Sequence, residues 1–183
     1  MIVTARLLLR PFTAVDRTPF FELNTHPMVV ESLGSSPSRD ESDAVVDAFL
    51  AEMAREGWGL WAVEVSGGAA LAGMVGLHRV NPALPCAPAV EVGWRLHPDH
   101  WGHGYATEAA AAALAYGFAA GLEEIVAFTT TVNTRSQAVM ERIGMTRDLG
   151  GDFDHPSLPE GSPLRRHVLY RISASQHAHS VAP

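Results

Sequence analysis

Gly102 and Gly104 stand two residues apart, between an apolar alternating segment at 90–96 and an Ala-rich segment that begins at Glu108. This order predicts a strand, a Gly-rich turn and a helix. Glycine carries no Cβ, so the backbone of such a turn can approach a ligand closely. The following helix offers unpaired N–H groups and the positive end of its dipole at the same place. The sequence therefore predicts an anion site here, and phosphate is the biological anion that best fits it.

Other interpretations of this segment are less well supported. A dinucleotide-binding fingerprint needs a third glycine, but position 107 is Thr, and the acidic pair Glu123–Glu124 precedes the next apolar run instead of following it. A plain strand-to-helix turn is the simplest alternative. His97, His100 and His103 have a spacing that would suit a metal ion on a helix, but a proline and a glycine among them make the segment a turn. We therefore expect no metal site.

The same segment resembles the acyl-CoA-binding segment of the GCN5-related N-acetyltransferase (GNAT) family. The family's pattern is an apolar strand end, often a proline, then Arg or Gln, Gly, any residue, Gly, any residue, and Gly or Ala. Those positions are filled here by Leu96, Pro98, Trp101, Gly102, His103, Gly104, Tyr105 and Ala106. Trp101 stands where the family most often has Arg or Gln. The phrase WGHGYATEA is similar to the branch that includes ribosomal-protein N-terminal acetyltransferases.

The resemblance implies a role for each part of the segment. The backbone N–H groups from Trp101 to Ala106 would hold the pyrophosphate of acetyl-CoA. The His103 side chain either adds a contact there or is a solvated turn histidine. At the end of the preceding strand, the backbone around Leu96 and His97 would pair with the pantetheine arm. An N–H group at that point would stabilise the oxyanion that develops on the acetyl group.

A second motif is Asn133-x-x-Ser136, within the segment NTRSQAVMERIGM. Both residues stand at the expected start of a helix and, being three apart, share one of its faces. The resemblance implies that Asn133 contacts the pantetheine arm and that Ser136 lies near the sulfur, where a hydrogen bond would help the thiolate to leave. On the residues alone, Asn133 is also a good helix cap and Ser136 an ordinary first-turn residue. Capping and binding can hold together for Asn133.

Glu91 is the best candidate for the base that removes a proton from an amine. It lies five residues before Leu96 on the predicted strand, and a carboxylate facing a cleft accepts a proton directly or through a water. The alternatives are that Glu91 is an ion-paired or solvated strand residue and that a chain of waters is the base. His155 and His167 are weaker candidates for the same role.

Together these residues predict an N-acetyltransferase that transfers an acetyl group from acetyl-CoA to a primary amine, on a protein or peptide N-terminus or on a small molecule. Direct attack in a ternary complex is expected, because the single cysteine, Cys86, lies in a Pro-rich segment without a catalytic partner pattern. A non-catalytic acyl-CoA-binding module, or an acyltransferase for a longer donor such as succinyl-CoA, is the alternative. Glu91 and Ser136 argue against the non-catalytic module.

The chain has 183 residues, of which 47% are hydrophobic, and a formal net charge of −7. That length favours one domain, and the charge, without a basic block, disfavours nucleic-acid binding and suits a cationic amine. The longest apolar run, 109–120, is too short to span a bilayer, and no signal-peptide pattern opens the chain. We expect a cytoplasmic enzyme, a monomer or a homodimer, without a membrane partner.

The predicted fold class is α/β (α+β), with a mixed, mostly antiparallel central sheet, helices on both faces, and a strand, Gly-rich turn and helix that form the acyl-CoA site. This order of elements matches the GNAT fold. Residues 1–172 are assigned to the acetyltransferase domain and 173–183 to a disordered tail. A helix at 107–120 is expected to be buried all round. A first helix is expected within 13–24, with Pro19 as a candidate for its first residue. Loops are expected at 26–38 and 146–163, and segments 26–38 and 152–163 would shape the acceptor pocket.

Overall fold

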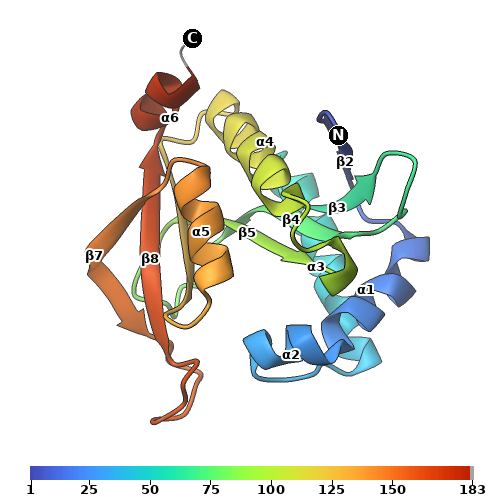
Figure 1. Cartoon of the computed structure of the whole chain (residues 1–183), viewed down its shortest axis with the longest axis horizontal. Coiled ribbons are helices and arrows are strands. Elements are labelled where there is room, and N and C mark those ends of the chain that lie inside the picture. The colour runs from blue at the N-terminus through green and yellow to red at the C-terminus, as the bar shows by residue number, and fades with distance from the viewer. Residues whose placement is uncertain (182–183) are drawn as a thin grey trace.

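The computed structural model describes residues 1–181 as one eight-stranded sheet with helices on both faces (Figure 1). The strand order is β1-β2-β3-β4-β5-β6-β8-β7. The strands are β1 (Ile2–Val3), β2 (Leu7–Arg10), β3 (Leu60–Val65), β4 (Gly73–Arg79), β5 (Val90–Leu96), β6 (Glu124–Thr130), β7 (Thr146–Asp154) and β8 (Arg166–Ser173). Neighbouring strands are antiparallel except β5 and β6, which are parallel. The predicted fold class is confirmed.

The helices are α1 (Arg17–Thr25), α2 (Pro27–Leu33), α3 (Arg39–Glu56), α4 (Tyr105–Ala119), α5 (Thr134–Arg142) and α6 (Ala174–Val181), with two 3-10 turns, η1 (Ala14–Asp16) and η2 (Pro98–His100). α4 and α5 cover one face of the sheet, and α1, α2 and α3 cover the other. In β3, Trp61 and Val63 belong to the core between the sheet and α4. Leu60 and Ala62 belong to the core between the sheet and helices α1, α2 and α3. This is the division expected where successive side chains point to opposite faces.

β5 and β6 separate towards their carboxyl ends. Their register contains one residue pair, Glu91 with Val126. In the described chain, no residue of β6 is paired with the last five residues of β5. The N–H and C=O groups that β5 turns towards β6 therefore line an opening between the two strands. The Gly-rich turn begins at the same end of β5, so the sheet places it at the mouth of this opening.

The first helix does not begin at Pro19 as predicted. α1 begins at Arg17 with Asp16 as its N-cap, so Pro19 lies within the first turn. The N–H groups of a first turn have no intrahelical partner, and a proline there removes no helical hydrogen bond.

The segment 26–38, predicted to be loop, contains α2. His26 is its N-cap and accepts a hydrogen bond from the Met28 N–H (3.3 Å). Pro27 is its first residue, and Gly34 ends it with a φ of 77°. The proline and glycine that look like loop signals in the sequence are here the start and stop of a short helix.

The segment 146–163, also predicted to be loop, begins with strand β7. Its sequence, TRDLGGDFD, is rich in glycine and aspartate, which disfavour strands. The strand forms because it pairs with β8 and because Phe153 is buried in a core with Leu169. The register is interrupted between Asp148 and Phe153, around the two glycines. Tertiary pairing has overridden local propensity.

The tail predicted for 173–183 is a helix as far as the structure describes it. Ser173 ends β8, and the Ala174 N–H donates to the Glu123 carbonyl (2.9 Å) as α6 begins. The His177 ring lies 4.9 Å from the Phe118 ring, centroid to centroid. These partners lie on α4 and on the segment before β6, so no local pattern reveals them. Residues 182–183 lie outside the described residues.

α4 is not buried all round as predicted. Ala109, Ala110 and Ala113 are buried, whereas Ala111 and Ala115 are exposed. Alanine is small and a strong helix former, so it occupies both faces and conceals the amphipathic pattern. Within residues 1–181, no helix is long and apolar enough to cross a membrane.

Candidate functional site

The Gly-rich turn has the predicted position between β5 and α4. Gly102 and Gly104 have φ of 79° and 78°, in the left-handed region that glycine tolerates best. Gly104 is the N-cap of α4 and provides no capping side chain. The N–H groups of the first turn of α4 therefore point out of the helix without an intrahelical partner. No atom lies within 4 Å of a Cβ built on Gly102, so the turn is open to a ligand.

Trp101 connects the turn to both walls of the opening. Its indole Nε1 donates to the Leu96 carbonyl at the end of β5 (2.8 Å). The Arg135 guanidinium, from the first turn of α5, lies 4.8 Å from the centroid of the Trp101 ring, which is a cation–π distance. The Arg or Gln common at this position is absent here, but Trp101 places a cation from α5 beside the turn.

The N-terminal segment holds the first turn of α4 from the other side. Arg6 forms an ion pair with Glu108 (2.7 Å) and donates from Nη1 to the His103 carbonyl (2.9 Å). Thr4 Oγ1 also donates to Glu108 (2.6 Å). Burial would raise the pKa of Glu108, but the hydrogen bonds from Thr4 and Arg6 lower it below its usual value. Glu108 is therefore ionised. It ties the N-terminal segment to α4, and Arg6 neutralises its charge.

Leu96 and His97 turn their N–H groups to opposite sides of β5. The His97 N–H donates to the Ala72 carbonyl, next to β4 (2.8 Å). Because successive N–H groups of a strand alternate in direction, the Leu96 N–H faces β6 and the opening. Of the two backbone positions predicted to contact the pantetheine arm, the N–H of Leu96 is the one at the opening.

Asn133 and Ser136 lie at the start of α5, on the β6 side of the opening. Asn133 Oδ1 accepts a hydrogen bond from the Ser136 N–H (3.1 Å), so Asn133 is the predicted N-cap. Among the described residues, neither Asn133 Nδ2 nor the Ser136 hydroxyl has a hydrogen-bond partner. Both side chains are partly buried. Capping uses the oxygen of Asn133 and leaves its nitrogen free to donate to a ligand.

Glu91 is buried, with 8% of its surface exposed, and lies opposite His78 in the register of β4 and β5. His78 Nε2 is 3.1 Å from Glu91 Oε2, and His78 Nδ1 is 3.3 Å from the Arg79 carbonyl. Both partners accept hydrogen bonds, so the ring satisfies both only when each nitrogen carries a proton. Burial lowers the pKa of His78, but the hydrogen bond and charge of Glu91 raise it above its usual value overall. Glu91 is thus ion-paired through Oε2, and its other oxygen, Oε1, takes no part in this ion pair.

The other candidate histidines lie apart from this pair. The rings of His155 and His167 are 5.3 Å apart, and His167 stacks on Phe153. Burial lowers the pKa of His167. His103 is exposed and stacks on Tyr105, with 5.4 Å between ring centroids. Within the described chain, no group of three or more His, Cys, Asp or Glu side chains is arranged to hold a metal ion.

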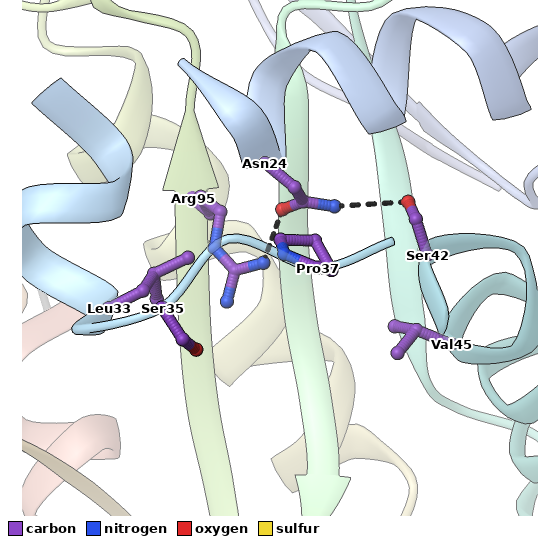
Figure 2. A pocket seen from close by; sticks show the side chains of 7 residues that line it. All are labelled: Asn24, Leu33, Ser35, Pro37, Ser42, Val45 and Arg95. Atoms are coloured by element: carbon purple, nitrogen blue, oxygen red, sulfur yellow. Dashed lines mark hydrogen bonds between the residues drawn. The ribbon is translucent and has the colours of Figure 1, made fainter. Parts of the chain in front are cut away.

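A cavity of about 240 Å³ lies beneath the helices on the opposite face from α4 (Figure 2). Its lining residues are Asn24, Leu33, Ser35, Pro37, Ser42, Val45 and Arg95. Arg95, the last residue but one of β5, donates from Nη1 to Asn24 Oδ1, and Asn24 Nδ2 donates to Ser42 Oγ (3.4 Å). Burial lowers the pKa of Arg95 to about 10. The predicted acceptor segment 26–38 contributes three of the lining residues.

Sequence reasoning missed His78, Arg95 and Arg135. Arg135 contacts Trp101 across 34 positions of sequence, and His78 meets Glu91 only through strand register. A signal for Arg95 was present, because side chains two apart on a strand share a face, so Arg95 and Glu91 lie on one face of β5.

Comparison with known proteins agrees with this geometry. A family model described as an acetyltransferase (GNAT) domain matches residues 6–146. A similar curated protein is the uncharacterized N-acetyltransferase YoaA of Bacillus subtilis (strain 168). It is 26% identical over 151 residues, which cover 81% of this chain and 84% of that protein.

Solved structures are similar over nearly the whole chain. The acetyltransferase (GNAT family) from Bacillus anthracis has a TM-score of 0.78 and 28% identity, covering 95% of this chain and 98% of that one. RimL, a ribosomal L7/L12 alpha-N-protein acetyltransferase solved in complex with coenzyme A, has a TM-score of 0.76, covering 93% and 96%. Its 18% identity makes that likeness one of fold. The resemblance seen in the Gly-rich turn is confirmed.

Proposed function

The chain belongs to the GNAT family of acetyltransferases, and from that premise we propose that it transfers an acetyl group from acetyl-CoA to a primary amine by direct attack in a ternary complex. The observation that carries the proposal is the opening between β5 and β6, with the Gly-rich turn at its mouth. An extended arm with amide groups fits between separated strands, because unpaired strand N–H and C=O groups bond it as they would an added strand.

The residues around the opening fit acetyl-CoA. The first-turn N–H groups of α4, beside Gly102 and Gly104, suit the pyrophosphate, and Arg135 adds a nearby positive charge. The pantetheine arm lies along β5 and meets the free Nδ2 of Asn133. The acetyl oxygen accepts a hydrogen bond from the Leu96 N–H, which stabilises the negative charge that develops there.

The reaction removes one proton from the amine, and the departing thiolate needs a hydrogen bond to stabilise its charge. The amine lone pair forms a bond to the acetyl carbon, the C–S bond breaks, and CoA leaves as a thiolate. Glu91 takes up, through a chain of waters, the proton that the amine loses, because it lies five residues before Leu96 on β5. The Ser136 hydroxyl donates a hydrogen bond to the departing sulfur.

An acyl-enzyme on Cys86 is disfavoured, because burial raises the pKa of its thiol and the thiolate is the nucleophile. The alternatives of a non-catalytic binding module and a longer acyl donor use the same opening. They differ from the proposal only in turnover and in donor size.

We also propose the cytoplasm as the compartment, supported by the lone Cys86, and a protein without nucleic-acid or membrane partners, supported by the acidic charge. Light scattering of the pure protein would decide between monomer and homodimer.

The test of the main proposal pairs two measurements. Thiol release from acetyl-CoA is followed over a panel of amines, and CoA binding is measured by calorimetry. CoA binding with turnover of at least one amine supports the enzyme. CoA binding without turnover of any amine would favour the non-catalytic module, and a faster rate with succinyl-CoA would favour the longer donor.

A further inference from the structure

Arg95 differs from most arginines of this chain in having no carboxylate partner. In the described residues, ten of the thirteen arginines lie within 4.0 Å of an Asp or Glu oxygen, namely Arg6, Arg10, Arg17, Arg39, Arg55, Arg79, Arg147, Arg165, Arg166 and Arg171. Arg135 lies against Trp101, and Arg142 is exposed. Arg95 alone combines limited exposure with a neutral partner, the amide of Asn24.

This arrangement is costly in the free protein. A guanidinium that leaves water loses hydration, and a neutral amide restores only part of it. The lowered pKa of Arg95 reflects the same cost, because burial destabilises its charged form. A carboxylate would offset the cost, since it matches the guanidinium fork with two parallel charge-assisted hydrogen bonds.

The cavity around Arg95 has room for such a group. None of its seven lining residues is acidic, and Asn24, Ser35 and Ser42 add polar atoms. Figure 2 shows one terminal nitrogen of Arg95 directed to Asn24 and the other directed away from it. The second nitrogen is therefore available to a ligand in the cavity.

Arg95 lies on the same strand face as Glu91, the proposed base. Glu91 and Arg95 are four residues apart on the same face of β5, so their Cα atoms are about 13 Å apart at about 3.3 Å per residue. Gly93 lies between them, and a Cβ built there would have His78 Nε2 as its nearest atom at 3.7 Å. Arg95 directly precedes Leu96, whose N–H faces the opening, so a group bound at Arg95 lies closer to the proposed acetyl position than to Glu91.

We propose that the acceptor is an amine that also carries a carboxylate, with the carboxylate bound by Arg95 and the amine turned towards the acetyl group at the Leu96 N–H. This inference rests on the proposed acetyl transfer and names its acceptor class.

The test compares acids with their own amides. The substrates are ω-amino acids from glycine to 6-aminohexanoate and, for each, the primary amide, which keeps the amine and removes the negative charge. Because a charge-assisted hydrogen bond to Arg95 is lost with the amide, at least one acid should exceed its amide about 10-fold or more in kcat/KM, which is about 1.4 kcal/mol.

Two variants and a control test whether Arg95 causes the preference for acids over amides. Arg95→Met keeps the length of the side chain and removes its charge, so the acid-to-amide ratio should fall to about one while amide turnover persists. Asn24→Asp gives Arg95 a carboxylate within the chain and should lower the ratio without loss of melting temperature. Arg142→Gln removes an exposed charge from α5 and should leave the ratio unchanged.

Each result decides the inference. Equal kcat/KM for acids and amides, or a preference that survives both Arg95→Met and Asn24→Asp, overturns it. If Arg95→Met does not fold, Asn24→Asp alone decides. If the wild-type protein turns over no amine, the proposed function fails, and calorimetry with the same acids and amides in the presence of CoA becomes the test. Tighter binding of the acids that Asn24→Asp abolishes then supports the anion site, and equal binding overturns it.

Discussion

The Gly-rich turn and the Arg95 cavity both place positive charge at the proposed site, but they do so differently. At the turn the positive charge comes from backbone N–H groups, and the nearby Arg6 is neutralised by Glu108. In the cavity the charge is a side chain, and an amide is its partner. A backbone site tolerates most changes of side chain, so it suits a cofactor shared by a family. A side-chain site changes with one substitution, so it suits an acceptor particular to this chain.

The largest expected effect is on the turn. Gly104→Val forces a branched residue into a backbone with φ of 78°, beside the Arg6 guanidinium, which lies 3.5 Å from a Cβ built there. The strain distorts the turn and so displaces the first-turn N–H groups. Loss of two such bonds to phosphate, at about 1.5–3 kcal/mol each, weakens CoA binding about 100-fold or more. Calorimetry with CoA measures this. Gly57→Val is the matched control, because Gly57 also has a φ of 77° and ends a helix elsewhere. Equal losses in both variants would mean that strain, and not the site, explains the result.

The next effect separates proton removal from CoA binding. Glu91→Gln keeps the hydrogen bond to His78 but cannot take a proton, so kcat should fall by about 100-fold or more while CoA affinity is unchanged. Steady-state kinetics over a range of pH, with calorimetry on the same samples, measures both. An unaltered rate and pH profile would make Glu91 structural and a water chain the base.

A smaller effect tests the β6 side of the opening. Asn133→Ala removes both a helix cap and a ligand donor, so it should weaken CoA binding and destabilise the apo protein by about 0.5–2 kcal/mol. Ser136→Ala should lower kcat with little change in CoA affinity or melting temperature, because its hydroxyl has no partner in the described structure. Thermal unfolding and kinetics of both variants give the comparison. Full kcat in Ser136→Ala would make water the donor to sulfur.

The smallest effect is on stability. The pKa of His78 is raised in the folded protein, so the pair with Glu91 stabilises the fold below the unfolded value near pH 6.5, and this contribution is lost as pH rises through the folded value. His78→Gln should therefore cost about 0.5–1 kcal/mol at pH 5.5 and little at pH 9. Urea unfolding at both values measures it, with His103→Gln, at an exposed position, as control. A cost that is equal at both values would exclude the ion pair as its source.

The two regions also differ in how far the sequence predicts them. The turn, the start of α4 and the Asn133 cap depend on residues within a few positions of one another, so local patterns identify them. The cavity joins Asn24, Ser42 and Arg95 from two helices and a strand, and its main contact spans 71 positions. Local patterns also fail for β7, where pairing with β8 outweighs the glycine and aspartate content. Sequence reasoning therefore predicted the position of the turn and the helix cap. For the cavity it predicted segment 26–38 but missed Asn24, Ser42 and Arg95.

The single residue pair between β5 and β6 has a mechanical consequence. It makes the sheet two leaves, β1–β5 and β6–β8, that are joined by one bridge and by the core under α4. A pantetheine arm that bonds to β5 within the gap would hold the two leaves together and restrict their relative motion. Amide hydrogen exchange should therefore slow along both β5 and β6 when CoA binds. The cofactor would then raise the free energy of unfolding of the chain as well as take part in its reaction.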